Sequence, residues 1–309
     1  MSVPRTSPPT PASDKTRLAL LAAALVGIQV GAATTASRYV MAETAPASLA
    51  LMRYVIGFLC LLPVLLTSRP KRFAGRDLLP IASLGIIQFG LLIALLNLGL
   101  TTIPAGRAAL ILATAPLLTM VIAAGIGREA LTVAKSVGVV LSFVGVATAI
   151  TGSGPLGVGW FGDAGVGDFA VFGAALCAAV CSVLYRPYLQ RYAALPVSTL
   201  AMLASVIFLC VPAAYEGLFN GWPQISGGGW LAVLFVGMSS GIGYFLWLWA
   251  LAHTTPTRAS ILLALSPITA TTLGFWLLAE PVTVPFLVGL VLVAAGLICA
   301  LTDRSARHD

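Results

Sequence analysis

Charged residues are scarce in this sequence. Asp, Glu, Lys and Arg together make up 9% of its 309 residues, whereas hydrophobic residues make up 59% and the mean hydropathy is +1.01. A soluble domain carries a charge on roughly a quarter of its residues. The shortage of charge therefore argues against a soluble domain and indicates a chain that folds in lipid.

The sequence also lacks the residue groups of several common activities. It has no Walker motif, so ATP is not the direct energy source in this chain. The glycines of 157–162 have the spacing of a dinucleotide fingerprint, but they follow an apolar helix rather than a strand. Segment 237–241 has the spacing of a nucleophile elbow, and His253, the nearest base, lies about one helix length away. The cysteines are expected to be unpaired and to form no metal site. We therefore expect no enzyme, no cofactor and no metal.

Apolar stretches divide the chain into ten expected spans. About 20 apolar residues cross a bilayer, and lipid offers backbone groups no partner, so such stretches must be helical. No alternating pattern of a barrel is present. The spans lie near residues 18–40, 48–67, 78–100, 103–126, 133–151, 168–190, 197–216, 229–252, 257–279 and 284–302. We predict an all-α membrane protein of ten transmembrane helices, preceded by a disordered cytoplasmic tail at residues 1–17.

The distribution of basic residues predicts the orientation. With the N-terminus in the cytoplasm, nearly all of the 17 Lys and Arg residues lie on the inner side, and only Arg38, Arg53 and Arg107 do not. The positive-inside rule then places both termini in the cytoplasm, in the inner cell membrane. These basic residues accompany no nucleic-acid-binding motif, so we expect no nucleic-acid partner.

The two halves of the sequence repeat one another at an offset of 151 residues. The offset superposes Arg107-Ala108, Pro116, Glu129, Thr132, Gly138 and Gly145 on Arg258-Ala259, Pro267, Glu280, Thr283, Gly289 and Gly296. We therefore predict two units, 18–151 and 152–309. Because each has an odd number of spans, five, the second must enter the membrane from the opposite side. Two inverted repeats of five helices result, an arrangement suited to alternating access.

The same residues resemble the drug/metabolite transporter superfamily and, within it, the EamA-type ten-helix exporters. The resemblance rests on Arg38, Pro46 and Arg53, on Ala108 to Pro116 followed by Glu129-Ala-Leu-Thr132, and on Arg258 to Pro267 followed by Glu280-Pro-Val-Thr283. It implies export of small metabolites, amino acids among them, from the cytoplasm. It also implies a central site lined by the first, third, fourth, sixth, eighth and ninth spans, with the fifth and tenth packing peripherally or against a partner.

Three pairs of repeated residues are structural or functional candidates. Pro116 and Pro267 each free a backbone carbonyl in mid-span, which produces either a hinge or a static kink. Arg107 and Arg258 open their helices, where a cation needs an anionic neighbour. That neighbour could be a lipid phosphate, a loop carboxylate such as Glu280 or Glu129, or a substrate carboxylate. Glu129 and Glu280 precede Thr132 and Thr283, which are placed to cap the next helix, and proton coupling through these carboxylates is the alternative.

Polar and aromatic side chains within the spans are candidates for substrate binding. They are Gln29, Thr34, Gln88, Asn97, Ser240, Tyr244 and Trp247. Buried amides and hydroxyls in lipid need a partner, which can be a ligand or merely another helix. Tyr244 and Trp247 could stack on an apolar or aromatic substrate.

Together these features predict a secondary transporter or facilitator that exports small organic metabolites, amino acids or related amphipathic compounds, by alternating access. The expected partners are a small-molecule substrate and the lipid bilayer, with the protein a monomer or a weak dimer. The alternatives are a non-transporting membrane receptor or scaffold, and an intramembrane enzyme.

Overall fold

The structure is a bundle of helices. The computed structural model describes residues 11–67, 73–127, 132–151, 163–221, 223–254 and 262–301, and these residues form helices and turns with no strand. Within these described ranges, eight helical segments are long and apolar enough to cross a membrane, and two shorter apolar helices accompany them, Leu265–Leu278 and Val284–Ala300. The prediction of an all-α membrane protein is confirmed.

The helices of the first half follow the predicted spans closely. They are α1 (Pro11–Val40), α2 (Pro46–Thr67), α3 (Gly75–Gly85), η1 (Ile86–Leu91), α4 (Leu92–Gly99), α5 (Ala105–Leu112), α6 (Ala115–Gly125) and α7 (Val133–Thr151). The helix α1 begins at Pro11, before the predicted start of the first span at residue 18, and residues 1–10 of the predicted tail lie outside the described residues.

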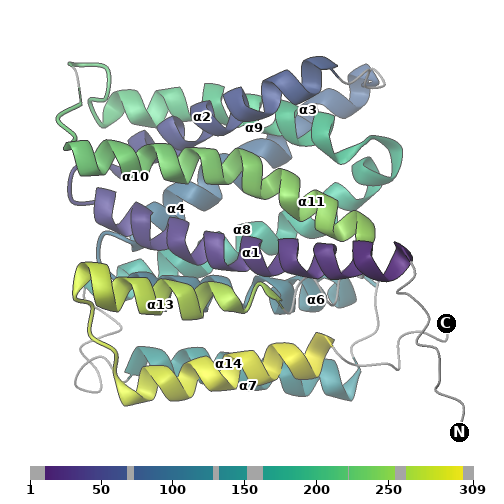
Figure 1. Ribbon diagram of the computed structural model, residues 1–309, viewed down its shortest axis with the longest axis vertical. Coiled ribbons are helices and arrows are strands. Elements are labelled where there is room, and N and C mark those ends of the chain that lie inside the picture. Colours follow the sequence, from purple (N-terminus) through teal and green to yellow (C-terminus); the bar gives the residue numbers. More distant parts are fainter. Residues whose placement is uncertain are drawn as a thin grey trace, which may run out of the picture.

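The helices of the second half that lie in the described ranges follow the same order. They are α8 (Asp163–Arg191), α9 (Ala194–Tyr215), α10 (Gly227–Met238), η2 (Ser239–Gly243), α11 (Tyr244–His253), α13 (Leu265–Leu278) and α14 (Val284–Leu301). The helices lie roughly along one direction, and α1 begins at the same end of the bundle at which α14 ends (Figure 1). We call this the near end. The far end carries the connections 41–45, 100–104, 216–221 and 279–283.

Two spans are interrupted by π-helical segments. The segment η1 lies between α3 and α4, and η2 lies between α10 and α11. A π turn places an extra residue in a helix and leaves a backbone carbonyl free of its usual partner, which is why such turns are frequent at functional sites. The two segments occupy corresponding positions in the two halves, because Gln88 in η1 precedes Ser239 in η2 by the repeat offset of 151 residues.

The helices α7 and α14 form a tightly packed pair at one edge of the bundle (Figure 1). Glycines allow their backbones to touch: a Cβ added at Gly138 would lie 2.5 Å from the carbonyl oxygen of Gly296, and one added at Gly289 would lie 2.4 Å from that of Gly145. Small residues at a helix crossing give close van der Waals packing where lipid provides no hydrophobic driving force. The fifth and tenth predicted spans therefore pack against each other.

Candidate functional site

A cavity of about 260 Å³ lies where α1 and α2 meet the two π segments. Its lining includes five of the predicted substrate-binding residues, which are Gln29, Gln88, Ser240, Tyr244 and Trp247. Residues of both halves thus face one space, which we call the central cavity. Its volume lies just below the range of about 300–1,000 Å³ that holds drug-sized ligands.

Polar groups of the central cavity are held by the second π segment. Gln29 on α1 donates from Nε2 to the backbone oxygen of Ser239 at 3.0 Å. Arg53 on α2 donates from Nε to the hydroxyl of Ser240 at 2.6 Å, and that hydroxyl donates to the Val236 carbonyl at 2.9 Å. The π segment therefore fixes the positions of an amide and a guanidinium group from the first half.

Aromatic rings make up much of the remaining wall. The ring of Phe89 in η1 packs edge to face on Tyr54 and on Tyr244, with centroids 5.2 Å and 6.3 Å apart. The hydroxyl of Ser198 donates to that of Tyr244 at 2.7 Å, which holds the Tyr244 ring in place. Edge-to-face aromatic pairs are a favoured arrangement that makes a rigid apolar surface. An apolar or aromatic ligand group would pack against this surface.

A second cavity of about 490 Å³ adjoins the central one and shares Val30, Trp247 and Leu263 with it. It extends along α6 and includes Pro116 in its lining. Here the fourth span is broken rather than merely kinked, because α5 ends at Leu112 and α6 begins at Ala115. Pro267 lies in the first turn of α13, directly after the turn at 263–264. Both predicted prolines therefore lie beside an interruption of the helix.

Two predicted substrate-binding residues lie elsewhere. Thr34 is buried and donates to the Val30 carbonyl of its own helix at 2.9 Å. Asn97 is fully buried and donates from Nδ2 to the Pro46 carbonyl at 2.9 Å, which joins α4 to the start of α2. Neither lines the central cavity. Thr34 thus bonds within its own helix, whereas the contact of Asn97 is that of a group that holds two helices together.

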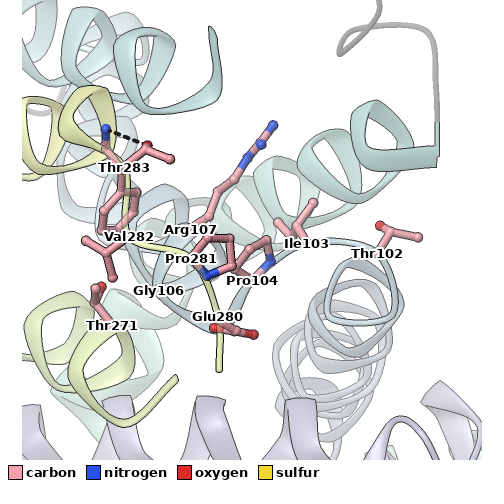
Figure 2. A pocket seen from close by; sticks show the side chains of 11 residues that line it. Thr102, Ile103, Pro104, Gly106, Arg107, Thr271, Glu280, Pro281, Val282 and Thr283 are labelled. Carbon is pink, nitrogen blue, oxygen red and sulfur yellow. Dashed lines mark hydrogen bonds between the residues drawn. The ribbon is translucent and has the colours of Figure 1, made fainter. Parts of the chain in front are cut away.

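Arg107 has a partner that the sequence reasoning did not consider. Its Nε donates to Oδ1 of Asp168 on α8 at 2.7 Å, and its Nη2 donates to Oδ2, so the ion pair is bidentate. In Figure 2 the Arg107 guanidinium points away from the Glu280 carboxylate. Glu280 was one of several neighbours that the sequence left open for Arg107, and the structure instead pairs Arg107 with Asp168 of α8, which begins at Asp163. Arg258 and Glu129 lie outside the described residues.

Glu280 instead caps α5 from the other half of the chain. Its two carboxylate oxygens accept from the backbone N–H of Ala105 at 3.1 Å and 3.0 Å, and Oε1 lies 3.5 Å from Nε of Arg38. Glu280 and Arg107 both line a pocket of about 300 Å³ at the far end (Figure 2). Burial raises the pKa of Glu280 above its usual range, and the Ala105 N–H and the Arg38 guanidinium offset part of that rise. A carboxylate at a helix N-terminus is favoured by the helix dipole.

The two threonines of the repeated Glu-x-x-Thr segments do cap helices. The Thr132 hydroxyl accepts from the Lys135 N–H at 3.3 Å, and the Thr283 hydroxyl accepts from the Phe286 N–H at 3.4 Å. Figure 2 draws the second of these bonds. Each threonine precedes the helix that it caps, as the spacing predicted.

Sequence reasoning missed further polar links at the far end. Glu216 accepts from the N–H groups of Ala47 and Ser48 at 2.9 Å and 2.7 Å, which caps α2. Glu43 accepts from the Ser226 N–H at 2.7 Å, just before α10. The sequence offered one signal for these links: Glu43 and Glu216 are among only ten acidic residues and lie outside the apolar stretches, where a carboxylate can cap a helix N-terminus.

The sequence is similar to a known protein family along most of its length. It matches the EamA-like transporter family at residues 17–151 and again at residues 165–302. The chain belongs to the EamA-like transporter family. The resemblance to drug/metabolite transporters is thereby confirmed, and the protein is a membrane transporter with many apolar helices.

Several relatives cover most of both chains. An uncharacterized transporter of Archaeoglobus fulgidus is 27% identical over 89% of this chain and 95% of its own length. A probable terminal-alkyne amino-acid exporter of Streptantibioticus cattleyicolor is 30% identical over 73% of this chain and 74% of its own length. A crystal structure with 20% sequence identity covers 93% of this chain and 96% of its own, with a TM-score of 0.63. That likeness shows the fold.

Proposed function

We propose that this EamA-family protein is a secondary exporter that moves small organic metabolites, amino acids and related amphipathic compounds among them, out of the cytoplasm by alternating access. The observation that carries the proposal is the central cavity, which is lined by residues of both halves at their corresponding π segments. Broken or unwound helices around a site at the repeat interface are typical of secondary transporters. The amino-acid exporter among the relatives supports the substrate class.

The packing of α7 on α14 supports ten spans arranged as two inverted repeats. Gly138 meets Gly296, and Gly145 meets Gly289. In the repeat, however, Gly138 corresponds to Gly289 and Gly145 to Gly296. Gly138 therefore meets the counterpart of Gly145, and Gly145 meets the counterpart of Gly138. A two-fold axis requires such reciprocal contacts. Such an axis between the halves lies in the membrane plane when the repeats are inverted.

Hydrogen bonds at the two ends of the bundle also support two inverted repeats. After α1, Glu43 accepts from the N–H of Ser226, the residue before α10. After α8, the hydroxyl of Tyr192 accepts from the N–H of Ala74, the residue before α3, at 3.1 Å. The connection after the first span thus caps the eighth, and the connection after the sixth caps the third. Under a pseudo-two-fold axis these two caps are equivalent.

The proposed orientation keeps both termini in the cytoplasm, in the inner cell membrane, with residues 18–151 and 152–309 as the two repeats and the protein a monomer or a weak dimer. The adjoining second cavity then lies on the cytoplasmic side of Trp247, since α6 and α11 both run towards the near end. It would admit cargo to the central cavity, and the polar links at the far end would close the opposite side. A rocking of the halves would open those links.

Counterflow into proteoliposomes tests the proposal. Vesicles containing the purified full-length protein are loaded with an unlabelled neutral amino acid, and uptake of the same labelled compound is measured against protein-free vesicles. We expect transient accumulation above equilibrium for at least one member of a panel of neutral amino acids and related amphipathic metabolites. A panel without any counterflow would count against transport and favour a receptor or scaffold.

A further inference from the structure

We propose that Arg53 is the anion-binding group of the central cavity, and that the cargo is a compound with one carboxylate beside an apolar or aromatic portion. The inference deepens the proposed function and rests on it. It starts from the position of Arg53, the eighth residue of α2, which spans Pro46–Thr67. At 1.5 Å per residue this is about 10 Å along the helix from its far-end start. Its guanidinium group is half-buried and reaches Ser240 of η2, well inside the ends of the bundle.

Arg53 has no carboxylate partner within the described residues. The other two arginines that the positive-inside rule leaves unexplained are both paired, Arg38 with Glu280 and Arg107 with Asp168. Arg53 forms one side-chain hydrogen bond in the described part of the chain, to the neutral hydroxyl of Ser240. An arginine in the middle of a membrane helix costs about 2.5–3.5 kcal/mol on insertion scales, and such residues mark substrate or ion pathways. The position therefore needs an anion that the described residues do not supply.

The local packing holds the Arg53 side chain against the second π segment. A Cβ added at Gly241 would lie 2.9 Å from the carbonyl oxygen of Gly57, so α2 and η2 are in backbone contact one turn beyond Arg53. The Ser240 hydroxyl uses its own proton on Val236 and so accepts from Nε of Arg53. The terminal nitrogens have no hydrogen bond to the described residues and remain for a ligand. A guanidinium group binds a carboxylate by two parallel N–H···O bonds, which adds both energy and direction.

The rest of the central cavity indicates what accompanies the carboxylate. Its wall is aromatic, with Phe89, Tyr54, Tyr244 and Trp247, and the Cζ atom of Arg53 lies 5.7 Å from the centroid of the Tyr54 ring. Among the residues that the structure describes, no Asp or Glu belongs to this lining. An ammonium group on the cargo would therefore meet amide oxygens and ring faces rather than a countercharge. The carboxylate is required and the ammonium is optional.

The need for a carboxylate but not for an ammonium group can be tested with matched compounds. The probes are L-leucine and L-phenylalanine, their des-amino acids 4-methylpentanoate and 3-phenylpropanoate, and their amides leucinamide and phenylalaninamide. Binding is measured as thermal stabilisation of the purified protein, and transport as counterflow. We expect the amino acids and des-amino acids to act at concentrations at least about tenfold lower than the amides, since charge-assisted bidentate bonds are lost with the carboxylate.

The variants are Arg53→Gln and Arg53→Lys, with Arg76→Gln as a control that removes a positive charge from an exposed position at the near end. Arg53→Gln should abolish the preference for acids over amides, Arg53→Lys should keep part of it, and Arg76→Gln should keep all of it. Size-exclusion profiles identify variants that fail to fold, and the wild-type acid-to-amide ratio remains informative without them.

The outcomes separate the two proposals. If wild-type protein transports amides as well as acids, or if Arg53→Gln keeps the preference, the anion subsite is overturned and transport stands. If carboxylates stabilise the protein through Arg53 but nothing is transported, the subsite stands and the proposed function falls. If no carboxylate probe stabilises the protein, the subsite is overturned.

Discussion

Arg107 on α5 and Asp168 on α8 form a bidentate ion pair whose side chains are only 6% and 10% exposed. The pair joins the first half of the chain to the second near the far end of the bundle. A buried charge that loses its partner is left without water or a countercharge, which is costly, whereas an apolar pair of similar volume can replace both charges at little cost.

The Arg107–Asp168 pair can be tested by a double-mutant cycle. We expect Arg107→Met alone and Asp168→Leu alone each to destabilise the protein by about 3–5 kcal/mol, and the double variant to recover most of that loss. Apparent melting temperatures in detergent measure the effect. Additive losses in the double variant would mean that the two charges do not depend on each other.

Gly289 tests the contact between α7 and α14. Gly289→Ala places a Cβ 2.4 Å from the Gly145 carbonyl oxygen, so the helices must separate. We expect a destabilisation of about 1–3 kcal/mol, the usual cost of overpacking, seen as a lower apparent melting temperature. Gly125→Ala is the matched control, because nothing lies within 4 Å of that added atom. Equal effects of the two substitutions would argue against the close crossing.

Cysteine labelling separates a carrier from a receptor without an open cavity. In a background without the native cysteines, Gln88→Cys and Tyr244→Cys should react with a small water-soluble thiol reagent, because both positions line the central cavity. Asn97→Cys should react far more slowly, since Asn97 is fully buried outside that cavity. Transported compounds should slow labelling at the first two positions. Uniform protection of all three would favour a scaffold.

Pro116→Ala tests whether the break in the fourth span serves transport. The substitution restores an N–H that can reach the Leu112 carbonyl, so α5 and α6 can join into one helix. We expect the rate of counterflow to fall several-fold while the protein still folds. Pro63→Ala, at an exposed position inside α2, should leave the rate unchanged. A normal rate for Pro116→Ala would show that the break is static.

The raised pKa of Glu280 predicts a pH-dependent stability. Because folding raises this pKa, the protonated carboxyl stabilises the folded state below the ordinary value of 4.5, and that contribution is lost as the pH rises through the raised pKa. The melting temperature of Glu280→Gln, relative to wild type, should therefore rise as the pH is increased above 4.5. Parallel melting curves of the two proteins across this interval would contradict the shift.

The fold was accessible from the sequence because lipid imposes simple rules. Runs of apolar residues had to be helices, and the described helix ends mostly lie within a few residues of the predicted span limits. The Glu-x-x-Thr segments fixed the starts of α7 and α14 through Thr132 and Thr283, since capping is a local interaction. These features depend on neighbours in the sequence.

The site was accessible only in part, because it depends on contacts between distant segments. Polarity within spans identified Gln29 and Ser240, but could not distinguish them from Asn97, whose amide joins two helices. The pairing of Arg107 with Asp168 depends on the packing of α5 against α8, and the residues next to Arg107 in the sequence do not indicate which carboxylate it binds. The π segments left no signal in the hydropathy, since one added residue changes the composition of a span very little.

The π segments also determine where the chain can tolerate the deletion of one residue. Each π turn accommodates one residue more than an α-helix of the same length would hold. A single-codon deletion in a regular membrane helix rotates every later side chain by about 100°, which destroys the packing beyond it. Within Ile86–Leu91 or Ser239–Gly243 the same deletion would restore a regular α-helix and leave the flanking turns in place. We therefore expect that chain length at these two points can change with the loss of the central cavity alone, while the surrounding bundle is preserved.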